Sequence, residues 1–388
     1  MGKRPLDGVR VLDLSRLLPG PFCTLLLADL GAEVIKIEDT AGGDTIRGMA
    51  PFIGGQGAYF LALNPGKKSL ALNLKADGGR EAFLRLAATA GVIVEGFRPG
   101  TVDRLGIGFE AVKAFRPGIV YCSISAYGQD GPFRDRAGHD LNSIARSGIL
   151  GLTGGDGGVP PIPPVQIADL SAGMYAAVAI LAALRRSEFS GEGRYIDISM
   201  MDSAMSWLIM TAAEFAAGDR GRRGKLHLTG KYPCYNVYRT KDGREVTLAA
   251  LEPKFWAEFL KATGRTDLAG LQYSEDPKAF DEIGALFAGR TFEEWEALAK
   301  IGDFCCDPVL SMDEAMLDAQ VRHRGLIRLT KVGEETNIEL GNPLRRLEGI
   351  KPGPAPAPGE HTWALLRELG YSDEDLAALA ASGAIPSK

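Results

Sequence analysis

The chain has 388 residues, more than one domain of the usual size holds, so we expect two domains with an ample core. Its 44 basic and 49 acidic residues nearly balance, and the longest basic stretch spans only 220–225, which argues against a nucleic-acid-binding or membrane-surface protein. The N-terminus shows no signal-peptide pattern, and no apolar run approaches the ~20 residues of a membrane span, so we expect a cytoplasmic protein without a membrane segment.

Five cysteines, an odd number, are scattered over the sequence at 23, 122, 234, 305 and 306. None of them forms a Cys-x-x-Cys pair. Such a set predicts buried free thiols in a reducing compartment and no zinc or other metal site.

The N-terminal part alternates short apolar strands with helices. Val9–Leu14 is expected to be the first strand, and a helix runs from Pro21, whose missing N–H costs nothing at a first helical position, to about Leu30. Further strands are expected at 33–38, 69–74, 91–96 and 119–124, with helices at 76–90 and 101–115. This alternation predicts an α/β fold with a Rossmann-like parallel sheet. Because the chain lacks Gly-x-Gly-x-x-Gly after the first strand, a dinucleotide site is poorly supported.

Several basic residues fall near strand or helix ends of this sheet: Lys67, Lys68, Lys75, Arg98 and Arg104. Each of them alone is typical of solvated surface charge. If they converge on one rim, they suit the phosphates of a nucleotide-like handle.

Polar motifs follow the strand at 119–124, where open α/β sheets present their chemistry. They are Ala-Tyr-Gly-Gln-Asp-Gly-Pro at 126–132, Ala-Gly-His-Asp at 137–140 and Ala-Asp-Leu-Ser at 168–171. His139 and Asp169 are their titratable centres, and such a pair can exchange protons near neutral pH. The alternatives are a solvated histidine in a glycine-rich turn and an aspartate that only caps a helix.

The second half begins with two apolar helices, expected at 169–186 and 199–217 around a strand at 194–198. The later of these helices needs a partner surface, for which we expect a second subunit. A Gly- and Arg-rich linker at 220–230 then marks a domain boundary.

Beyond the linker, a β-hairpin is expected from strands at 235–238 and 246–249 around Lys-Asp-Gly-Arg. Glu252 opens the next helix, either as a carboxylate that compensates the helix dipole or as a catalytic partner. The next expected elements are a helix at 276–298, a short strand and turn at 303–310 and a helix at 312–320. A stiff linker is expected at 352–358. A final helical pair at 361–379 is expected to pack on the first sheet.

Five motifs occur together in this chain: Leu-Asp-Gly-Val-Arg-Val-Leu-Asp-Leu-Ser at 6–15, Ala-Asp-Leu-Gly-Ala-Glu-Val-Ile-Lys-Ile-Glu at 28–38, the segment 64–75, Tyr-Gly-Gln-Asp-Gly-Pro at 127–132 and Ala-Asp-Leu-Ser-Ala-Gly at 168–173. Their combination resembles the family III CoA-transferases (the CaiB/BaiF family) over essentially the whole chain, and most closely the α-methylacyl-CoA racemase branch.

The resemblance implies a Rossmann-like large domain with a smaller α+β domain. On this chain the large CoA-binding domain would take residues 1–220, the small domain 221–330, and a C-terminal segment, 331–388, would return to the large domain. Two such chains form an interlocked homodimer in the family, which would account for the apolar helix at 199–217.

Two chemistries occur among the proteins that the chain resembles. In the CoA-transferases, an aspartate matching Asp169 attacks the acyl-CoA thioester and forms an acyl-aspartyl anhydride. In the α-methylacyl-CoA racemases, a histidine matching His139 and the same aspartate act as acid and base on opposite faces of the α-carbon, and a third carboxylate matches Glu252. A transferase has no use for a base at His139. The presence of all three residues therefore favours the racemase.

The resemblance also implies contacts with CoA, which would be the handle of an acyl-CoA thioester substrate, and no prosthetic group. The matching positions are Leu72, Lys75, Glu95, Phe97, Arg98, Arg104, Ala126, Tyr127 and Gly128. Many relatives carry an arginine just after the second strand, where this chain has Asp39 and Thr40. We therefore expect Arg16 or Arg47 to hold the adenine or phosphate end of CoA.

The leading hypothesis is an acyl-CoA racemase that inverts the α-carbon of 2-methyl-branched acyl-CoA thioesters. The alternative is a family III CoA-transferase that moves CoA between carboxylic acids. A CoA-binding protein without catalysis is the third class.

Overall fold

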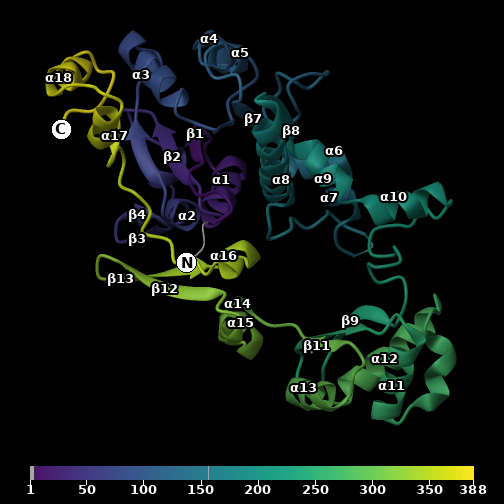
Figure 1. The fold of residues 1–388 in the computed structure, drawn as a ribbon. Coiled ribbons are helices and arrows are strands. Elements are labelled where there is room, and N and C mark those ends of the chain that lie inside the picture. The colour runs from purple at the N-terminus through teal and green to yellow at the C-terminus, as the bar shows by residue number, and fades with distance from the viewer. Residues whose placement is uncertain (1–3, 156) are drawn as a thin grey trace. The chain divides into compact units, whose positions relative to one another are not determined.

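The computed structural model describes residues 4–155 and 157–388 (Figure 1). The chain divides into two compact units. Unit 1 contains the chain up to Ser147, Pro164–Trp207 and Gln320–Lys388, and unit 2 contains Gly148–Pro163 and Leu208–Ala319. Unit 1 is therefore built from three separate segments of the sequence, the last of which is C-terminal.

The boundaries differ from the expected ones near 220 and 330, since the chain leaves unit 1 after Trp207 and returns at Gln320. Residues 148–163 also belong to unit 2. In that unit, helix α7 (Ile149–Leu152) lines a mostly apolar cavity of about 710 Å³ together with side chains from 208–249. This contact joins residues distant in the sequence, so the linear pattern did not indicate it.

Unit 1 is organised around a six-stranded parallel sheet with the order β5-β2-β1-β6-β7-β8. The strands are β1 (Arg10–Asp13), β2 (Glu33–Glu38), β5 (Lys68–Ala71), β6 (Val92–Glu95), β7 (Val120–Ser125) and β8 (Arg194–Ser199). In chain order this is the third, second, first, fourth, fifth and sixth strand, the arrangement of a doubly wound Rossmann sheet. The prediction of an α/β fold with a parallel sheet is confirmed.

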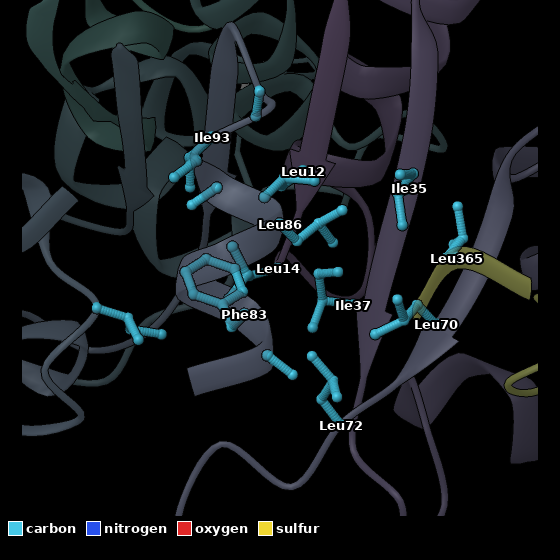
Figure 2. Close-up of a cluster of buried hydrophobic side chains, with 14 of the residues drawn as sticks. Leu12, Leu14, Ile35, Ile37, Leu70, Leu72, Phe83, Leu86, Ile93 and Leu365 are labelled. Atoms are coloured by element: carbon cyan, nitrogen blue, oxygen red, sulfur yellow. The ribbon is translucent and has the colours of Figure 1, made fainter. Parts of the chain in front are cut away.

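Helices and the C-terminal segment bury one face of this sheet. Leu12, Ile35 and Leu70 come from neighbouring strands and pack with Phe83 of α3 (Asp77–Ala87) and with Leu365 of α17 (Thr362–Glu368) (Figure 2). All five side chains are almost fully buried. The helical pair α17 and α18 (Asp373–Ala381) thus packs on the first sheet as expected, and Figure 1 shows these yellow helices beside the purple strands.

Helix α8 (Ile167–Ser190) packs along α1 (Pro19–Asp29) and against β7 and β8. This helix of 24 residues contains an 18-residue stretch of high hydropathy, and it is the one helix among the described residues that is long and apolar enough to cross a membrane, so the expectation of no such run is wrong. Core helices meet the same criterion. The side chains of α8 that face α1 and the sheet are buried, as in such a helix.

Three of the longer helices expected to be continuous are broken. The 101–115 helix divides into α4 (Thr101–Arg104) and α5 (Phe109–Lys113), because Gly106 adopts a left-handed φ of 70°. The other two give α9 (Met200–Ser206) with α10 (Ile209–Ala216), and α12 (Pro277–Ala288) with α13 (Phe292–Ile301). A capping box formed by Thr291 and Glu294 begins α13 as a separate helix.

Unit 2 contains the expected hairpin, β9 (Tyr235–Arg239) paired antiparallel with β10 (Glu245–Ala249), and β11 (Cys306–Pro308) adds a third strand. Its core is aromatic. Trp256 and Phe259 of α11 (Pro253–Thr263) pack with Phe287 and Trp295, which are buried.

Several further elements were not predicted from the sequence. They are β3 (Phe52–Ile53), β4 (Gln56–Gly57), α2 (Ala58–Leu63), α6 (Asp140–Ser147), α7, β12 (Ile327–Val332), β13 (Glu335–Leu340) and α16 (Pro343–Glu348), with 3-10 turns at Thr45–Gly48 and Thr266–Leu271. The expected helix at 312–320 is α14 (Met312–Leu317) followed by α15 (Ala319–His323).

Candidate functional site

The strand order reverses between β1 and β6, so the loops that follow these two strands diverge at the carboxyl edge of the sheet. Ligands of doubly wound folds bind at this position. A cavity of about 270 Å³ lies there, lined by side chains from the ends of four neighbouring strands. Its walls are Leu14, Arg16, Ile37, Glu38, Asp39, Leu72, Asn73, Leu74, Lys75, Phe97, Thr101 and Leu105. Three residues expected to contact CoA, Leu72, Lys75 and Phe97, are thus brought together.

The structure distinguishes the two arginines that we expected at the nucleotide end. Arg47 is committed to the protein: Nη2 and Nε donate to the two oxygens of Glu38, each at 2.7 Å, and Nη1 donates to the Pro356 carbonyl at 3.1 Å. Its guanidinium also lies 3.5 Å from the centre of the Phe60 ring. Arg16 instead lines the cavity and lies over the Phe97 ring at 5.7 Å. Arg16 is therefore the arginine available to a ligand.

Two of the expected rim lysines are also committed to structural contacts. Lys67 is buried and donates to Asp13 at 3.2 Å and to Thr24 at 2.7 Å. Lys68 forms an ion pair with Glu33 on the neighbouring strand. Their charges are therefore neutralised inside unit 1, and only Lys75 of the three lysines lines the cavity.

Glu95 ends β6 and is buried, with 2% of its surface exposed. Its Oε2 accepts the Phe97 N–H at 2.7 Å, and its carboxyl accepts a hydrogen bond from Ser123, whose Oγ in turn accepts from Tyr195 at 3.0 Å. Burial raises the pKa of Glu95 to about 7, although both hydrogen bonds act in the opposite direction. Glu95 thus fixes the backbone at Phe97 from inside the protein.

The Ala126–Gly128 turn packs against the segment that carries His139. A Cβ on Gly138 would lie only 2.9 Å from Cβ of Ala126 and 3.0 Å from the Tyr127 ring. A side chain at 138 would therefore collide with this turn, which is why the Ala-Gly-His-Asp motif needs its glycine. Gly128 itself has a φ of 90° and donates its N–H to Ser125 Oγ at 3.0 Å.

Asp140, which the sequence analysis did not single out, joins the two titratable centres. It opens α6, directly after His139, and its Oδ1 accepts the backbone N–H groups of Ala168 at 2.6 Å and Asp169 at 3.2 Å. His139 is exposed, and its own N–H donates to Asn142 Oδ1 at 3.0 Å. The segments of His139 and Asp169 are therefore tied together by a carboxylate between two helix N-termini.

Asp169 is the third residue of α8, so it is inside the helix and is not its N-cap. The N-cap is Gln166, which makes no capping hydrogen bond with its side chain, and Asp140 supplies the acceptor instead. Burial, and then the charge of Asp140, raise the pKa of Asp169 from 3.8 to about 7. The carboxyl of Asp169 can therefore take or give a proton near neutral pH.

Glu252 belongs to unit 2, where it is the N-cap residue of α11. Its side chain makes no capping hydrogen bond with that helix, so capping does not account for this carboxylate. Arg98 and Arg104 follow β6 at the edge of unit 1, and both are exposed. Within residues 4–155 and 157–388, no group of three or more His, Cys, Asp and Glu side chains is arranged to hold a metal ion.

Comparisons with known proteins identify the family of the chain. The family model of CoA-transferase family III matches residues 6–362. The chain is 35% identical over 397 residues to succinyl-CoA:glutarate CoA-transferase of Mus musculus, with 98% of this chain and 90% of the relative covered. It is 34% identical over 385 residues to alpha-methylacyl-CoA racemase of Mus musculus, with 96% of each covered.

A crystal structure of a CAIB/BAIF family protein from Brucella suis has the same fold. The two chains superpose with a TM-score of 0.81 at 28% identity, over 95% of this chain and all of the other. The family model and the relatives cover nearly the whole sequence. The chain belongs to CoA-transferase family III.

Proposed function

We propose that the protein is an acyl-CoA racemase that inverts the α-carbon of 2-methyl-branched acyl-CoA thioesters, with CoA as the handle and no prosthetic group. The observation that carries this proposal is the Asp140 carboxylate. It bonds to the N-terminus of α8 beside Asp169 and directly follows His139, so two proton-transfer groups come from adjoining segments.

In the proposed reaction, one group removes the α-proton, and the electrons of the C–H bond move toward the thioester oxygen to give an enolate. The other group then delivers a proton to the opposite face, and the thioester carbonyl is restored. Asp169 suits the first role because its pKa of about 7 lets it act as a base near neutral pH. His139 takes the second role, and Glu252 is proposed as a third catalytic carboxylate because the resemblance implies one at its position.

The developing negative charge on the thioester oxygen needs fixed donors. Backbone N–H groups of the glycine-rich turns beside His139 are suited to this, because preorganised dipoles cost no reorganisation during the reaction. Hydrogen-bond donors of this kind usually supply the largest single part of the stabilisation.

The second candidate is a CoA-transferase. The succinyl-CoA:glutarate CoA-transferase of Mus musculus is somewhat more similar to this chain, at 35% identity over 98% of it, than the racemase of the same species, at 34% over 96%. In that reaction, the Asp169 carboxylate would attack the thioester carbonyl, expel the CoA thiolate and leave an acyl-aspartyl anhydride. His139 would then be a bystander.

Replacement of His139 tests the proposal. We expect His139→Ala to lower α-proton exchange at least about a hundredfold, the lower range for loss of a positioned acid or base, while CoA affinity stays within about twofold. Exchange is followed by deuterium incorporation, and affinity by calorimetry. Exchange at the wild-type rate would remove His139 from the mechanism.

Hydroxylamine trapping addresses the alternative. Hydroxylamine would attack the aspartyl carbonyl of an acyl-aspartyl anhydride at Asp169, release the acyl group as its carboxylate and leave a hydroxamate on the peptide that contains Asp169. Under the racemase proposal, no modification forms at this residue. Modification dependent on acyl-CoA would favour the transferase.

We also propose a homodimer located in the cytoplasm. None of the eight residues of α10 is buried within the chain, although the helix is apolar. Its Ile209 and Met210 are exposed, as are Met205 and Trp207 just before it. An exposed apolar run of this kind is typical of a subunit interface.

A further inference from the structure

A second cavity of unit 1 is surrounded by cations. It has a volume of about 330 Å³ and is formed by the start of β12, the junction of β13 with α16 and the turn after α16. None of the described residues that line it is acidic. Five of them are basic: Arg324, Arg328, Arg345, Arg346 and Lys351. Positive charge is therefore concentrated around this space.

The cavity lies at the amino edge of the sheet, opposite the candidate functional site. Helix α1 follows the carboxyl end of β1 and returns along the sheet, so its last residue, Asp29, lies near the point where β2 begins at Glu33. Asp29 Oδ1 accepts a hydrogen bond from Arg345 Nε at 3.0 Å, and its Oδ2 accepts one from Asn342 Nδ2 at 2.6 Å. Both donors line the cavity, so the end of α1 fixes its position.

Two of the five cations are held rigidly by acidic partners. Arg345 is buried and pairs with Asp29, and its Nη1 donates to a backbone carbonyl. Arg328 Nε donates to Glu339 Oε2 at 2.9 Å, and its Nη2 donates to the Pro352 carbonyl, also at 2.9 Å. Among the described residues, neither Arg345 Nη2 nor Arg328 Nη1 has a hydrogen-bond partner. Each guanidinium is therefore fixed in place with one terminal nitrogen left over.

The other three cations are not neutralised. Arg324, Arg346 and Lys351 are exposed, and within the part of the chain that the structure describes none of them forms an ion pair. Glu348 also belongs to α16, but it does not line the cavity. Each of the three alone is typical of solvated surface charge. Around one cavity, they leave an excess of positive charge.

The fold of the chain at the end of α16 brings these cations together. Gly349 has a left-handed φ of 62°, and the Ile350 N–H donates to the Arg345 carbonyl at 3.1 Å. The chain therefore turns back on the helix at this glycine. This turn places Lys351 beside the arginines of α16, so the cluster is set by backbone geometry and does not depend on flexible side chains alone.

We propose that this cavity binds a small oxyanion with two or more negative charges, at a site separate from that of CoA. Arginine forks match the oxygens of carboxylates and phosphates, and the unbalanced cations call for more than one negative charge. Leu326, Ile327 and Ile350 supply apolar walls for a short carbon skeleton. The volume is at the lower end of the range of about 300 to 1,000 Å³ for small-molecule sites. The proposal does not rest on the proposed function.

Two sources share this chemistry, namely phosphate compounds and short dicarboxylates. Calorimetry with inorganic phosphate and with succinate, each added to the full chain at low ionic strength, separates them. Binding of phosphate alone assigns the first source, binding of succinate alone assigns the second, and binding of both assigns the shared oxyanion chemistry. Absence of binding of both anions at millimolar concentrations would overturn the site.

Replacement of the unpaired arginines locates the bound anion. We expect Arg324→Gln and Arg346→Gln each to weaken the affinity for the bound anion about tenfold, the lower range for loss of a charge-assisted contact. Arg322→Gln is the matched control, because Arg322 is an exposed arginine of α15 that does not line the cavity. Its affinity is expected to stay within about twofold of wild type. Equal affinities in all three variants and wild type would contradict the proposal.

A second titration separates this site from the carboxyl edge of the sheet. With CoA present at saturation, the affinity for the anion is expected to stay within about twofold, since the cavity lies at the opposite edge. Loss of anion binding in the presence of CoA would place the anion in the CoA site and overturn the proposal. Thermal unfolding of the variants checks that each replacement leaves the fold intact.

Discussion

Glu95 and Asp169 are two carboxyls that burial affects in the same way and that serve different purposes. In both, burial is the largest cause that raises the pKa to about 7. Glu95 accepts hydrogen bonds from the Phe97 N–H and from Ser123, so it holds the backbone at the carboxyl edge of the sheet. The charge of an acidic neighbour, Asp140, raises the pKa of Asp169 further. Its proton is therefore the one available for chemistry.

The raised pKa of Glu95 predicts how stability depends on pH. Below the ordinary pKa of about 4.5, Glu95 is neutral in both the folded and the unfolded protein. As pH rises from about 4.5 to about 7, the unfolded chain ionises first, so the folded state progressively loses stability relative to it.

Glu95→Gln removes this loss, because the amide stays neutral and still accepts the Phe97 N–H. We expect the variant to gain stability over wild type by on the order of 2 to 3 kcal/mol between about pH 5 and about pH 8. Urea unfolding at both pH values measures this change. Glu374→Gln, at an exposed helical glutamate, is the control, and a gain in Glu95→Gln that does not vary with pH would contradict the assigned cause.

At the residue scale, sequence and structure agree where a residue type is tied to local geometry. Gly138 and Gly128 are needed for a close approach and a positive φ, and their motifs were recognisable. Arg47 was a candidate ligand residue because its charge was visible in the sequence, but its bidentate pairing with Glu38 was not. Such pairing depends on tertiary contacts.

At the scale of elements, the junction of α6 with α8 is the feature that organises the site. The first N–H groups of a helix lack partners within the helix, and Asp140 accepts two of those of α8 from another helix. Its negative charge is favourable at that helix end and also raises the pKa of Asp169. One side chain thereby couples helix stability to proton affinity.

Asp140→Asn tests this coupling. The amide oxygen can still accept a hydrogen bond, but the charge is lost, so we expect about 1 kcal/mol lower stability. We also expect the pH midpoint that Asp169 sets for α-proton exchange to move below that of wild type. Asp313→Asn, in the first turn of α14 in unit 2, is the control. A lower rate with an unchanged midpoint would show that Asp140 acts only on structure.

Element boundaries were less predictable than element types. The alternation of apolar strands and helices was sufficient to predict the parallel sheet, because hydrophobic periodicity can be recognised within each short segment of the sequence. The break between α4 and α5 depends on a glycine conformation, and the break between α12 and α13 depends on a capping box. In both places the continuous apolar pattern predicted one helix. The hairpin β12–β13 was missed because most of its side chains are exposed or half-buried, so no apolar run marks its strands.

At the scale of the molecule, the sheet order places the ends of β1 and β6 together, and a cavity of about 270 Å³ forms where doubly wound folds bind ligands. The C-terminal return to this sheet was anticipated, whereas the assignment of residues 148–163 to unit 2 was not. Both depend on contacts between distant segments. The resemblance to the family indicated the C-terminal return, whereas no pattern in the sequence indicated that residues 148–163 belong to unit 2.

The central claim is that this chain moves a proton at the α-carbon of an acyl-CoA. The most direct test is NMR observation of deuterium at C2 of 2-methylacyl-CoA incubated with the wild-type protein in D₂O, with no carboxylic acid acceptor present. The account predicts incorporation together with the appearance of both epimers. No incorporation without acceptor, but formation of a new acyl-CoA once a carboxylic acid is added, would contradict it and make Asp169 the nucleophile of a CoA-transferase.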